Sequence, residues 1–501
     1  MNDKRKAIVI GSGIAGMAAA IRLTVQGFET SVYERNAYPG GKLSEFVQDG
    51  YRFDAGPSLF TQPERIAELF ELANAPIQEY IQWERVPVTC RYFFSNGKIV
   101  SAYAENELLA QEISEQLGEP PENILNYLKE SAAVYDDIGR IFLNHPLNKK
   151  ATWLHGRIWK ALRRLKISYL FSSMHQHNRK RFAQPETIQL FNRYATYNGS
   201  NPFRAPAMLS VIPHLELNEG TYYPKGGMIQ ITNALYRLAC AKGVQFHFNT
   251  PAERIILHEG RAKGIVANQQ NLHADIVISN ADAYFTYLQL LRDQETAGKL
   301  LRQERSSSAV IFYWGIQKSF PELQLHNIFF SENYQQEFEA IFKKHTLYHD
   351  PTIYINITSK MEAGLAPEGC ENWFVMINAP ANRGQNWEQL VVALKEVVIR
   401  KLSQQLGTDI APLIATERIH NPTSIESETG SYMGSLYGTS SNSKMAAFAR
   451  HSNDSSTING LYFCGGSVHP GGGIPLCLRS AAIVSDLIAQ KKSKPTRSHH
   501  S

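Results

Sequence analysis

Cysteine is scarce in this sequence, and its few cysteines are not spaced as pairs. Five are spread through 501 residues, and none forms a Cys-x-x-Cys pair. The odd number and wide spacing argue against a disulfide framework and against a zinc site. We therefore expect no bound metal, and reduced thiols that are buried as small hydrophobic side chains. The cysteines are Cys90, Cys240, Cys370, Cys464 and Cys477.

A long apolar run is also missing. No stretch approaches the ~20 apolar residues that a membrane-spanning helix needs. The N-terminus does not resemble a signal peptide, because Lys4-Arg5-Lys6 leads at once into the short apolar segment 7–10 and then into glycines. We expect a cytoplasmic protein that can meet a membrane from one side only.

Charge of one sign is not in large excess either. The formal net charge is +5, which gives no reason to expect nucleic acid as a partner. Hydrophobic residues make up 43% and charged residues 19%, so the chain can bury a sizeable core. Its 501 residues exceed a single-core domain, and we expect at least two lobes.

What the chain does contain is a glycine turn between a strand and a helix. Residues 7–10 form a predicted strand, residues 17–26 a helix and residues 28–34 a second strand. Such a βαβ unit predicts a parallel sheet. The turn follows the pattern GxGxxG and consists of Gly11, Ser12, Gly13, Ile14, Ala15 and Gly16.

This pattern predicts a dinucleotide site. Gly11 permits a tight turn, Gly13 lets the backbone approach a pyrophosphate, and Gly16 lets the helix pack closely on the strand. The free N–H groups and the positive dipole end of the helix favour phosphates. Glu34 ends the second strand, where a carboxylate accepts hydrogen bonds from a ribose and disfavours the 2′-phosphate of NADP.

A second glycine pair follows the predicted ribose acid. Gly40-Gly41 lets another loop approach a cofactor closely, and Lys42 adds a cation suited to phosphate. This pair favours FAD over NAD. The alternative is an ordinary Pro-Gly-Gly turn with a solvated lysine.

The strand and helix pattern divides the chain into pieces. Helical stretches rich in aromatic residues run from about 63 to 211, strand patterning returns at 244–279, and a strand at 461–463 precedes a glycine-rich turn and a helix at 476–489. We expect a dinucleotide lobe assembled from separated segments. That lobe takes residues 1–75, 212–290 and 443–490, a substrate-binding and membrane-associating region takes 76–211 and 291–442, and 491–501 form a disordered basic tail.

Five motifs, in order along the chain, resemble those of the flavoprotein superfamily that includes amine oxidases and carotenoid desaturases. They are 53–58 (FDAGPS), 194–199 (YATYNG), 220–228 (GTYYPKGGM), 278–282 (ISNAD) and 465–475 (GGSVHPGGGIP). The chain is most similar to the bacterial phytoene-desaturase type, over nearly its whole length. The form of the last motif is similar to that of hydroxycarotenoid 3,4-desaturases.

The resemblance implies an α/β fold with a Rossmann-type FAD-binding domain built from discontinuous segments, an inserted α+β substrate domain and a helical membrane-facing region. It implies an FAD-dependent desaturase that transfers a hydride from a carotenoid to the flavin, with 3,4-desaturation of a hydroxylated or γ-carotene-type substrate. Alternatives within the superfamily are a phytoene or dehydrosqualene desaturase, a carotene cis–trans isomerase, a polyene saturase and an amine oxidase. An isoprenoid-binding escort protein without flavin is an alternative of another class.

The resemblance also implies which residues hold the cofactor. The C-terminal motif of the family brings a strand end and a helix N-terminus to the flavin ring and ribityl chain. Lys42 departs from the arginine that the family more often has, and a lysine keeps the charge but not the fork geometry. Besides the turn 11–16, the implied contacts are Glu34, Arg35, Gly40, Gly41, Lys42, Leu43, Pro57, Ser58, Ala252, Gly465, Gly466, Gly473, Ile474 and Pro475.

No acid–base pair stands out for the proton that must leave together with the hydride. Conjugation spreads a developing cation over many carbons, which lessens the need for a strong base. His469, Glu216 and His214 lie in or near the motifs and are candidates, although such residues are more often structural hydrogen-bond partners. No second GxGxxG is present for NADPH, so we expect reoxidation by oxygen or a quinone.

Residues 149–181 contain ten Lys and Arg residues and no Asp or Glu, interleaved with Trp, Leu and Ile. Ile158, Leu162 and Leu165 fall on one helical face. This composition is typical of a helix in an anionic membrane surface, from which a water-insoluble carotenoid must be taken. The alternatives are a core-packing helix with a solvated basic face and a nucleic-acid patch. We expect peripheral association with the inner face of the cell membrane.

Overall fold

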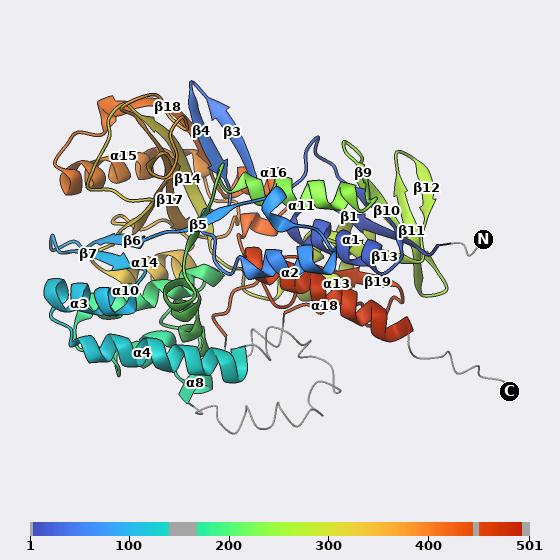
Figure 1. The fold of residues 1–501 in the computed structure, drawn as a ribbon, viewed down its shortest axis with the longest axis horizontal. Coiled ribbons are helices and arrows are strands. Elements are labelled where there is room, and N and C mark those ends of the chain that lie inside the picture. The colour runs from blue at the N-terminus through green and yellow to red at the C-terminus, as the bar shows by residue number, and fades with distance from the viewer. Residues whose placement is uncertain (1–3, 140–167, 444–449, 493–501) are drawn as a thin grey trace.

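Two lobes lie side by side in the protein (Figure 1). The computed structural model describes residues 4–139, 168–443 and 450–492. One lobe is built on a parallel sheet and the other on a larger, mostly antiparallel sheet, and the chain passes between them several times. This is the mixed α/β fold class that the sequence predicts.

The first lobe is built on a five-stranded sheet whose strands all run parallel. They come from three distant parts of the chain, and each part belongs to a segment predicted for the dinucleotide lobe. Parallel alignment brings the carboxyl ends of the strands to one edge of the sheet. In spatial order the strands are β19 (Leu461–Phe463), β13 (Ile276–Ser279), β1 (Lys6–Ile10), β2 (Glu29–Tyr33) and β9 (Gln245–His247).

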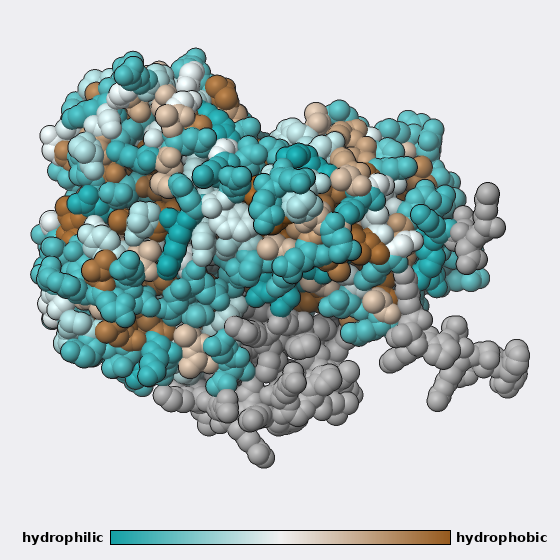
Figure 2. All heavy atoms as spheres, in the orientation of Figure 1, coloured by the Kyte–Doolittle hydropathy of each residue, from teal (hydrophilic) through white to brown (hydrophobic). Residues whose placement is uncertain are grey.

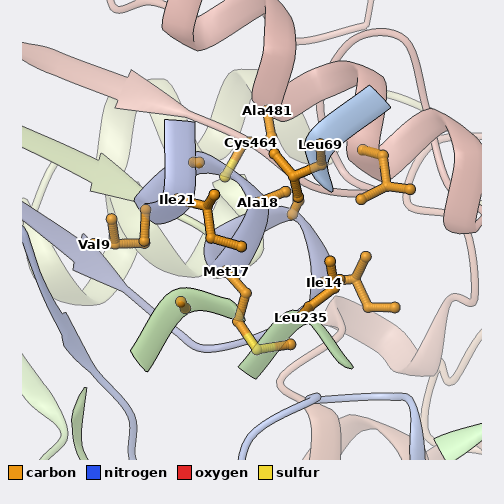
Figure 3. Packing of buried hydrophobic residues seen from close by; sticks show 14 of the residues in the cluster. Val9, Ile14, Met17, Ala18, Ile21, Leu69, Leu235, Cys464 and Ala481 are labelled. Carbon is orange, nitrogen blue, oxygen red and sulfur yellow. The ribbon is translucent and has the colours of Figure 1, made fainter. Parts of the chain in front are cut away.

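One face of this sheet is covered by helices. α1 (Ile14–Val25) follows β1 directly and packs against α2 (Glu64–Leu72), α11 (Ile229–Ala241) and α18 (Ile474–Lys492). Small residues along α1 let these neighbours approach closely. Figure 3 shows this core, in which Ile14, Met17, Ala18 and Ile21 of α1 lie among Val9, Leu69, Leu235, Cys464 and Ala481.

The other face of the same sheet is covered by strands and short helices. Side chains alternate along β1, so that Val9 packs with the helices while Ile8 and Ile10 pack on the opposite side. The opposite cluster includes residues of a three-stranded antiparallel sheet. This sheet consists of β10 (Ala252–His258), β11 (Arg261–Ala267) and β12 (Gln270–His273), and α12 (Ala283–Phe285) and α13 (Gln294–Leu301) pack beside it.

The second lobe is built on a seven-stranded sheet in which the β15–β6 pair is parallel and the other pairs are antiparallel. Helix α15 (Trp387–Leu406) covers one face, where Val398 packs with the buried side chains Trp314 and Trp373. The strand order is β18 (Ile414–His420), β14 (Ser308–Ile316), β17 (Glu371–Ala379), β16 (Ile353–Ile357), β15 (His326–Phe329), β6 (Val88–Phe93) and β7 (Ile99–Tyr103).

Strands β6 and β7 correct the sequence-based expectation that residues 63–211 are helical. This stretch also contains β5 (Trp83–Arg85), which pairs with β8 (Tyr222–Pro224). Both faces of β6 are covered, so its burial does not alternate and the period of two that marks a half-exposed strand is absent. Helices make up much of the rest, namely α3 (Asn106–Leu117), α4 (Pro121–Val134), α8 (Ser168–Phe171), α9 (Met174–Asn178) and α10 (Pro185–Asn192).

A hairpin lies between the two lobes in Figure 1. It consists of β3 (Ser44–Gln48) and β4 (Tyr51–Ala55), directly after the second glycine pair. Phe53 of this hairpin packs against Tyr313 of β14, so the segment that leaves the first lobe is anchored on the second. Two further helices complete the second lobe, α14 (Tyr334–Glu339) and α16 (Pro422–Thr429).

Two predicted segments lie partly outside the described residues. Most of the predicted membrane segment 149–181 is outside them, and the described end of that segment carries α8 and α9. Helix α18 continues to Lys492, so the first two residues of the predicted tail are helical and not disordered, while 493–501 lie outside the described residues. Within the three described ranges, no helix has both the length and the apolar composition to cross a membrane. Figure 2 shows a mostly hydrophilic face with apolar residues in small, separated groups.

Candidate functional site

The glycine turn after β1 has the geometry that the sequence predicts. Gly11 has φ +94°, a left-handed conformation that glycine adopts without strain, and it donates its N–H to the Tyr33 carbonyl at 2.8 Å. A Cβ on Gly16 would lie 2.2 Å from the Gly11 carbonyl oxygen, so only glycine fits there. The turn therefore holds the start of α1 tightly against the ends of β1 and β2.

Glu34 lies against this turn. One carboxylate oxygen, Oε2, accepts hydrogen bonds from the Ser12 N–H at 2.8 Å and from the Ser12 hydroxyl at 2.9 Å. The other, Oε1, accepts from the Asn36 N–H at 2.9 Å. The side chain is buried at the carboxyl end of β2. The structure thus places the predicted ribose acid beside the predicted pyrophosphate turn.

The second glycine pair rests on the first glycine turn. Gly40 donates its N–H to the Ser12 carbonyl at 3.0 Å, and Gly40 and Gly13 form a parallel bridge. A Cβ on Gly41 would lie 3.4 Å from the Cα of Gly13. These contacts bring together two segments that are separated in sequence, and glycine allows the approach of backbone to backbone.

Asn280 connects strand β13 to the two glycine segments. It follows β13 directly and lies close to Gly13 and Gly16. Its side-chain N–H donates to the Cys464 carbonyl at 3.1 Å. A Cβ on Gly465 would lie 2.6 Å from its side-chain nitrogen. Asn280 lies in the motif 278–282, but its sequence context did not predict this role. The sequence feature that could have indicated this role is an amide side chain directly after a predicted strand of the parallel sheet.

Two helix N-termini face this region without acidic residues in their first turns. Gly13 caps α1 with no side-chain hydrogen bond, so the first N–H groups of the helix stay available to an anion. Helix α18 begins at Ile474, and a Cβ on the preceding Gly473 would meet nothing within 4 Å. Open space beside a glycine at the start of a helix leaves room for a ligand. The described residues therefore fit a dinucleotide cofactor.

The C-terminal motif is held by two residues that the sequence analysis missed. Asn453 donates to the His469 carbonyl at 2.8 Å and to the Ser480 hydroxyl at 3.0 Å. Arg450 donates to the Gly466 carbonyl at 3.2 Å. Burial lowers the pKa of Arg450 to about 10, and the nearby Arg305 adds to this effect. No motif pointed to these residues, because they act on backbone carbonyls across a loop.

Lys42 and Arg35, two predicted cofactor contacts, make hydrogen bonds to backbone carbonyls. Lys42 donates to the Leu436 carbonyl at 3.0 Å, and burial lowers the pKa of its ammonium while Asp282 opposes that shift. Arg35 donates to the Glu428 carbonyl at 2.7 Å, at the end of α16. Both cations therefore tie the glycine segments of the first lobe to the chain that returns from the second.

The remaining predicted contacts are distributed over the same region and beyond it. Ile14 and Ala15 lie buried at the start of α1, and the Leu43 carbonyl accepts a hydrogen bond from Thr232 at 3.0 Å. Pro57 precedes Ser58, whose hydroxyl is hydrogen-bonded to the Tyr354 hydroxyl at 2.8 Å. Ala252 begins β10, and Pro475 lies in the first turn of α18.

The candidate proton-handling residues are not brought together. His469 lies buried in the C-terminal motif, and its N–H donates to the His451 carbonyl at 2.9 Å. Glu216 lies in the second lobe, fully buried in an ion pair with Arg193. His214, nearby in sequence, is hydrogen-bonded to Asn218 at 2.8 Å. Among the described residues, none of the three candidates is thus paired with another, although His214 lies 3.5 Å from the carboxylate of Glu219.

Glu216 belongs to a buried cluster of ionic and aromatic groups. Its Oε1 accepts hydrogen bonds from the Arg193 guanidinium and, at 3.0 Å, from the Tyr194 hydroxyl. Arg193 also donates to the Tyr92 hydroxyl and lies over the rings of Tyr92, Tyr194 and Tyr197. Burial raises the pKa of Glu216, while the charge of Arg193 lowers it. The aromatic rings and the carboxylate together compensate the buried guanidinium.

Comparison with known proteins assigns this architecture to a family. Residues 14–309 match the family model described as flavin containing amine oxidoreductase. An oxidoreductase of known structure from Methanosarcina mazei superimposes with a TM-score of 0.62 over 97% of this chain and 100% of that one. Its sequence is 16% identical, so this likeness shows the fold alone.

Two relatives match along nearly their whole length. The 1-hydroxycarotenoid 3,4-desaturase of Flavobacterium sp. (strain P99-3) is 48% identical, with 97% of this chain and 99% of the relative covered. The 4,4'-diapolycopene oxygenase of Methylomonas sp is 32% identical, with 97% and 98% covered. Neither match leaves out either lobe.

Proposed function

Because the chain belongs to the flavin-containing amine oxidoreductase family, we propose that it is an FAD-dependent carotenoid desaturase that introduces the 3,4 double bond into a 1-hydroxylated carotenoid. The observation that carries this proposal is the 48% identity to such an enzyme over 97% of the chain. The chain retains both glycine segments, the ribose acid and the C-terminal motif, so the frame for the cofactor is intact.

The cofactor of this family is a flavin, and FAD is the form that the first lobe suits. Helix α1 would meet the pyrophosphate with its N-terminal N–H groups, and Glu34 would accept hydrogen bonds from the ribose of the adenosine half. The start of α18 would meet the other end of the molecule. When bound, the flavin supplies the hydride acceptor for the dehydrogenation.

The two lobes divide the work in this proposal. Residues 1–75, 212–290 and 443–490 hold the cofactor, and residues 76–211 and 291–442 hold the polyene. The parallel sheet that draws on all three cofactor segments supports the first assignment. The face of the seven-stranded sheet opposite α15 supports the second, because Tyr354 on that face is hydrogen-bonded to Ser58, a proposed cofactor contact.

The proton that leaves the carotenoid needs an acceptor, and the chain offers two candidates. Glu216 has one oxygen, Oε2, without a hydrogen-bond partner among the described residues. His469 lies in the motif beside the start of α18. Since conjugation disperses the developing charge, a weak base or water next to either residue is sufficient. Electrons leave the protein to oxygen or a quinone in this proposal, because the chain has one dinucleotide motif.

A carotenoid substrate is insoluble in water, so we assign the protein to the inner face of the cell membrane as a peripheral protein. The basic segment 149–181 is the contact that its composition favours, and the described part of it is consistent with that role. Phe171 is 62% exposed there, and Arg179 and Lys180, further along the same segment, are also exposed. Exposed aromatic and cationic side chains in one segment are typical of an interfacial anchor.

Product analysis tests the proposal. The chain is expressed in bacterial cells that make 1-hydroxylycopene, and the carotenoids are identified by chromatography and absorption spectra. The expected product has one more conjugated double bond and absorbs further to the red. A product that absorbs to the blue would identify a saturase, and an isomer of unchanged mass would identify an isomerase. Purified protein that stays colourless after addition of FAD would identify a binding protein.

A further inference from the structure

Three neighbouring strands of the second lobe carry polar side chains on one face. His326 of β15 lies opposite Asn356 of β16, and Tyr354 of β16 lies opposite Ile328 of β15, which in turn pairs with Tyr92 of β6. Side chains two residues apart along a strand share a face, so Tyr92, His326 and Tyr354 lie on the same side of the sheet. The residues between them pack under α15 on the other side.

His326 presents a buried N–H donor on this face. The amide nitrogen of Asn356 donates to the Leu325 carbonyl at 3.1 Å, which fixes the amide orientation, and it approaches the His326 Nδ1 at 3.2 Å. An amide nitrogen can only donate, so Nδ1 is the acceptor and the proton of the neutral ring is on Nε2. Burial lowers the pKa of His326 to about 3, which keeps the ring neutral. Nε2 has no hydrogen-bond partner in the described part of the chain.

Glu216 presents a buried acceptor in the same lobe. Its Oε1 is occupied by Arg193 and Tyr194, while its Oε2 is buried and unpaired in the described ranges. Arg193 also donates to the Tyr92 hydroxyl, which places the ion pair over the sheet face that carries His326. A buried donor or acceptor that stays unpaired costs about 1–3 kcal/mol, so the donor on the sheet face and the acceptor in the ion pair over it are suited to a polar ligand.

This face is connected to the cofactor frame by a short hydrogen-bonded chain. The Tyr354 hydroxyl lies 2.7 Å from the Nδ1 of His326 and 2.8 Å from the hydroxyl of Ser58. Because Nδ1 accepts, Tyr354 donates to His326 and accepts from Ser58. Ser58 follows Gly56, which has a positive φ of 127°, and is a proposed cofactor contact. His326 is therefore two hydrogen bonds away from Ser58, a proposed cofactor contact.

We propose that His326 and Glu216 bind the hydroxyl end of the carotenoid, an inference that rests on the proposed function. A hydroxyl accepts one hydrogen bond and donates another, so it can accept from the His326 Nε2–H and donate to the Glu216 Oε2. The rest of the substrate is apolar and offers neither. Only one carbon separates the hydroxylated C1 from the reacting C3, so the hydroxyl site must lie near the cofactor. The hydrogen bonds through Tyr354 place His326 close to Ser58, a proposed cofactor contact. Both side chains are positioning and specificity residues in this arrangement.

Two variants of His326 test the proposal with the full-length FAD-loaded protein. His326→Asn keeps a polar group at the position of Nδ1 but removes the donor, whereas His326→Gln keeps an N–H donor at the position of Nε2. The kcat/KM for 1-hydroxylycopene and for lycopene is measured with each, and so is binding of both carotenoids by quenching of tryptophan fluorescence. We expect His326→Asn to lower the preference for the hydroxylated carotenoid at least about tenfold, the factor that corresponds to one lost hydrogen bond, and His326→Gln to keep it within about threefold.

Glu337→Gln serves as the matched control. Glu337 is a buried carboxylate of the same lobe whose oxygens accept from Ser331 and Thr352, so its replacement should lower stability and leave the preference unchanged. A folded His326→Asn protein with an unchanged preference in turnover and in binding would overturn the inference. If the parent protein makes no desaturated product but binds the hydroxylated carotenoid in a His326-dependent way, the proposed reaction is wrong and the binding site stands.

Discussion

Gly40 donates its backbone N–H to the carbonyl oxygen of Ser12 across 3.0 Å, so that the second glycine pair lies directly on the first glycine turn. This hydrogen bond joins a loop that leaves the first lobe to the turn that would hold the pyrophosphate. A Cβ on Gly41 would lie 3.4 Å from the Cα of Gly13, so the two segments are already in close contact. The cofactor site is therefore sensitive to substitutions that are small in volume.

Replacing Gly40 with alanine should weaken flavin binding. Gly40 has φ +108°, and a Cβ there would lie 2.4 Å from the Leu43 carbonyl oxygen, so the loop must shift away from Ser12. We expect FAD affinity to fall at least about tenfold, with a loss of stability of about 1–3 kcal/mol from strain. Gly97→Ala is the control, because Gly97 has φ +83° but open space around it and should lose stability alone. Flavin absorbance titration and thermal unfolding measure the two effects. An alanine variant that binds FAD as well as the parent would contradict the role of the contact.

Replacing Glu34 with glutamine should weaken FAD binding without unfolding the protein. The amide would turn a nitrogen toward donors that now meet an oxygen, and the charge-assisted hydrogen bonds from Ser12 and Asn36 would be weakened. Hydrogen bonds to charged groups contribute about 1.5–3 kcal/mol, so we expect the FAD dissociation constant to rise about 10-fold to 100-fold. Equilibrium dialysis against free FAD gives the number.

The control for this substitution is Glu119→Gln. Glu119 is another fully buried carboxylate that accepts backbone N–H bonds, from Ala183 and Gln184, but it lies in the second lobe. The Glu119→Gln substitution should lower the melting temperature and leave the FAD affinity unchanged. Equal effects of the two substitutions on FAD would show that global destabilisation, and not a ribose contact, explains the loss.

Charge reversal at Arg179 and Lys180 should weaken attachment to anionic membranes. Each cation near such a surface contributes about 1 kcal/mol, so the double change to glutamate should reduce the liposome partition coefficient at least about 30-fold. Flotation with vesicles that contain phosphatidylglycerol measures it. Arg292 and Lys263 are exposed cations of the first lobe. Replacing both with glutamate is the control, because it changes the net charge of the protein by the same amount. Equal losses for the two pairs would mean that net charge alone governs binding.

Acid should destabilise the protein partly through His326. An unfolded histidine has a pKa of about 6.5, and burial lowers that of the folded His326 to about 3, so the unfolded chain takes up its proton first as the pH falls. The stability that the neutral ring contributes is complete above pH 6.5 and is lost as the pH falls toward 3. Between pH 6.5 and pH 5 the loss reaches up to about 2 kcal/mol. Denaturant unfolding of parent and His326→Gln at both pH values should show this difference, and identical pH dependence would refute it.

The sequence predicted the parts of the fold and the site that local patterns encode. The βαβ unit follows from the apolar strand, the GxGxxG turn and the helix, all of which lie between Lys6 and Tyr33. The short strand β19 was predicted with its observed bounds, because it is flanked by glycine turns on both sides. The assembly of the parallel sheet from distant segments was predicted because strand patterns return at 244–279 and at 461–463.

Other features depend on contacts that no local pattern encodes. Strand β6 was missed because both of its faces are covered, which removes the alternation that reveals a strand. Asn280 and Arg450 act through backbone carbonyls of segments far away in sequence. Glu216 was a candidate base from its place near a motif. Its pairing with Arg193, which leaves one oxygen without a partner in the part of the chain that the structure describes, depends on how two helical turns meet.

The placement of β19 and α18 has a consequence for how the protein is made. The edge strand next to β13 and the helix that packs on α1 both come from the last fifty or so described residues, although β1 and α1 come from the first thirty. During synthesis the first glycine turn therefore emerges long before its partners, and the first lobe cannot close until residues 461–492 have been made. Cofactor loading then follows the synthesis of β19 and α18, and ribosome-bound chains that stop before residue 461 should carry no flavin.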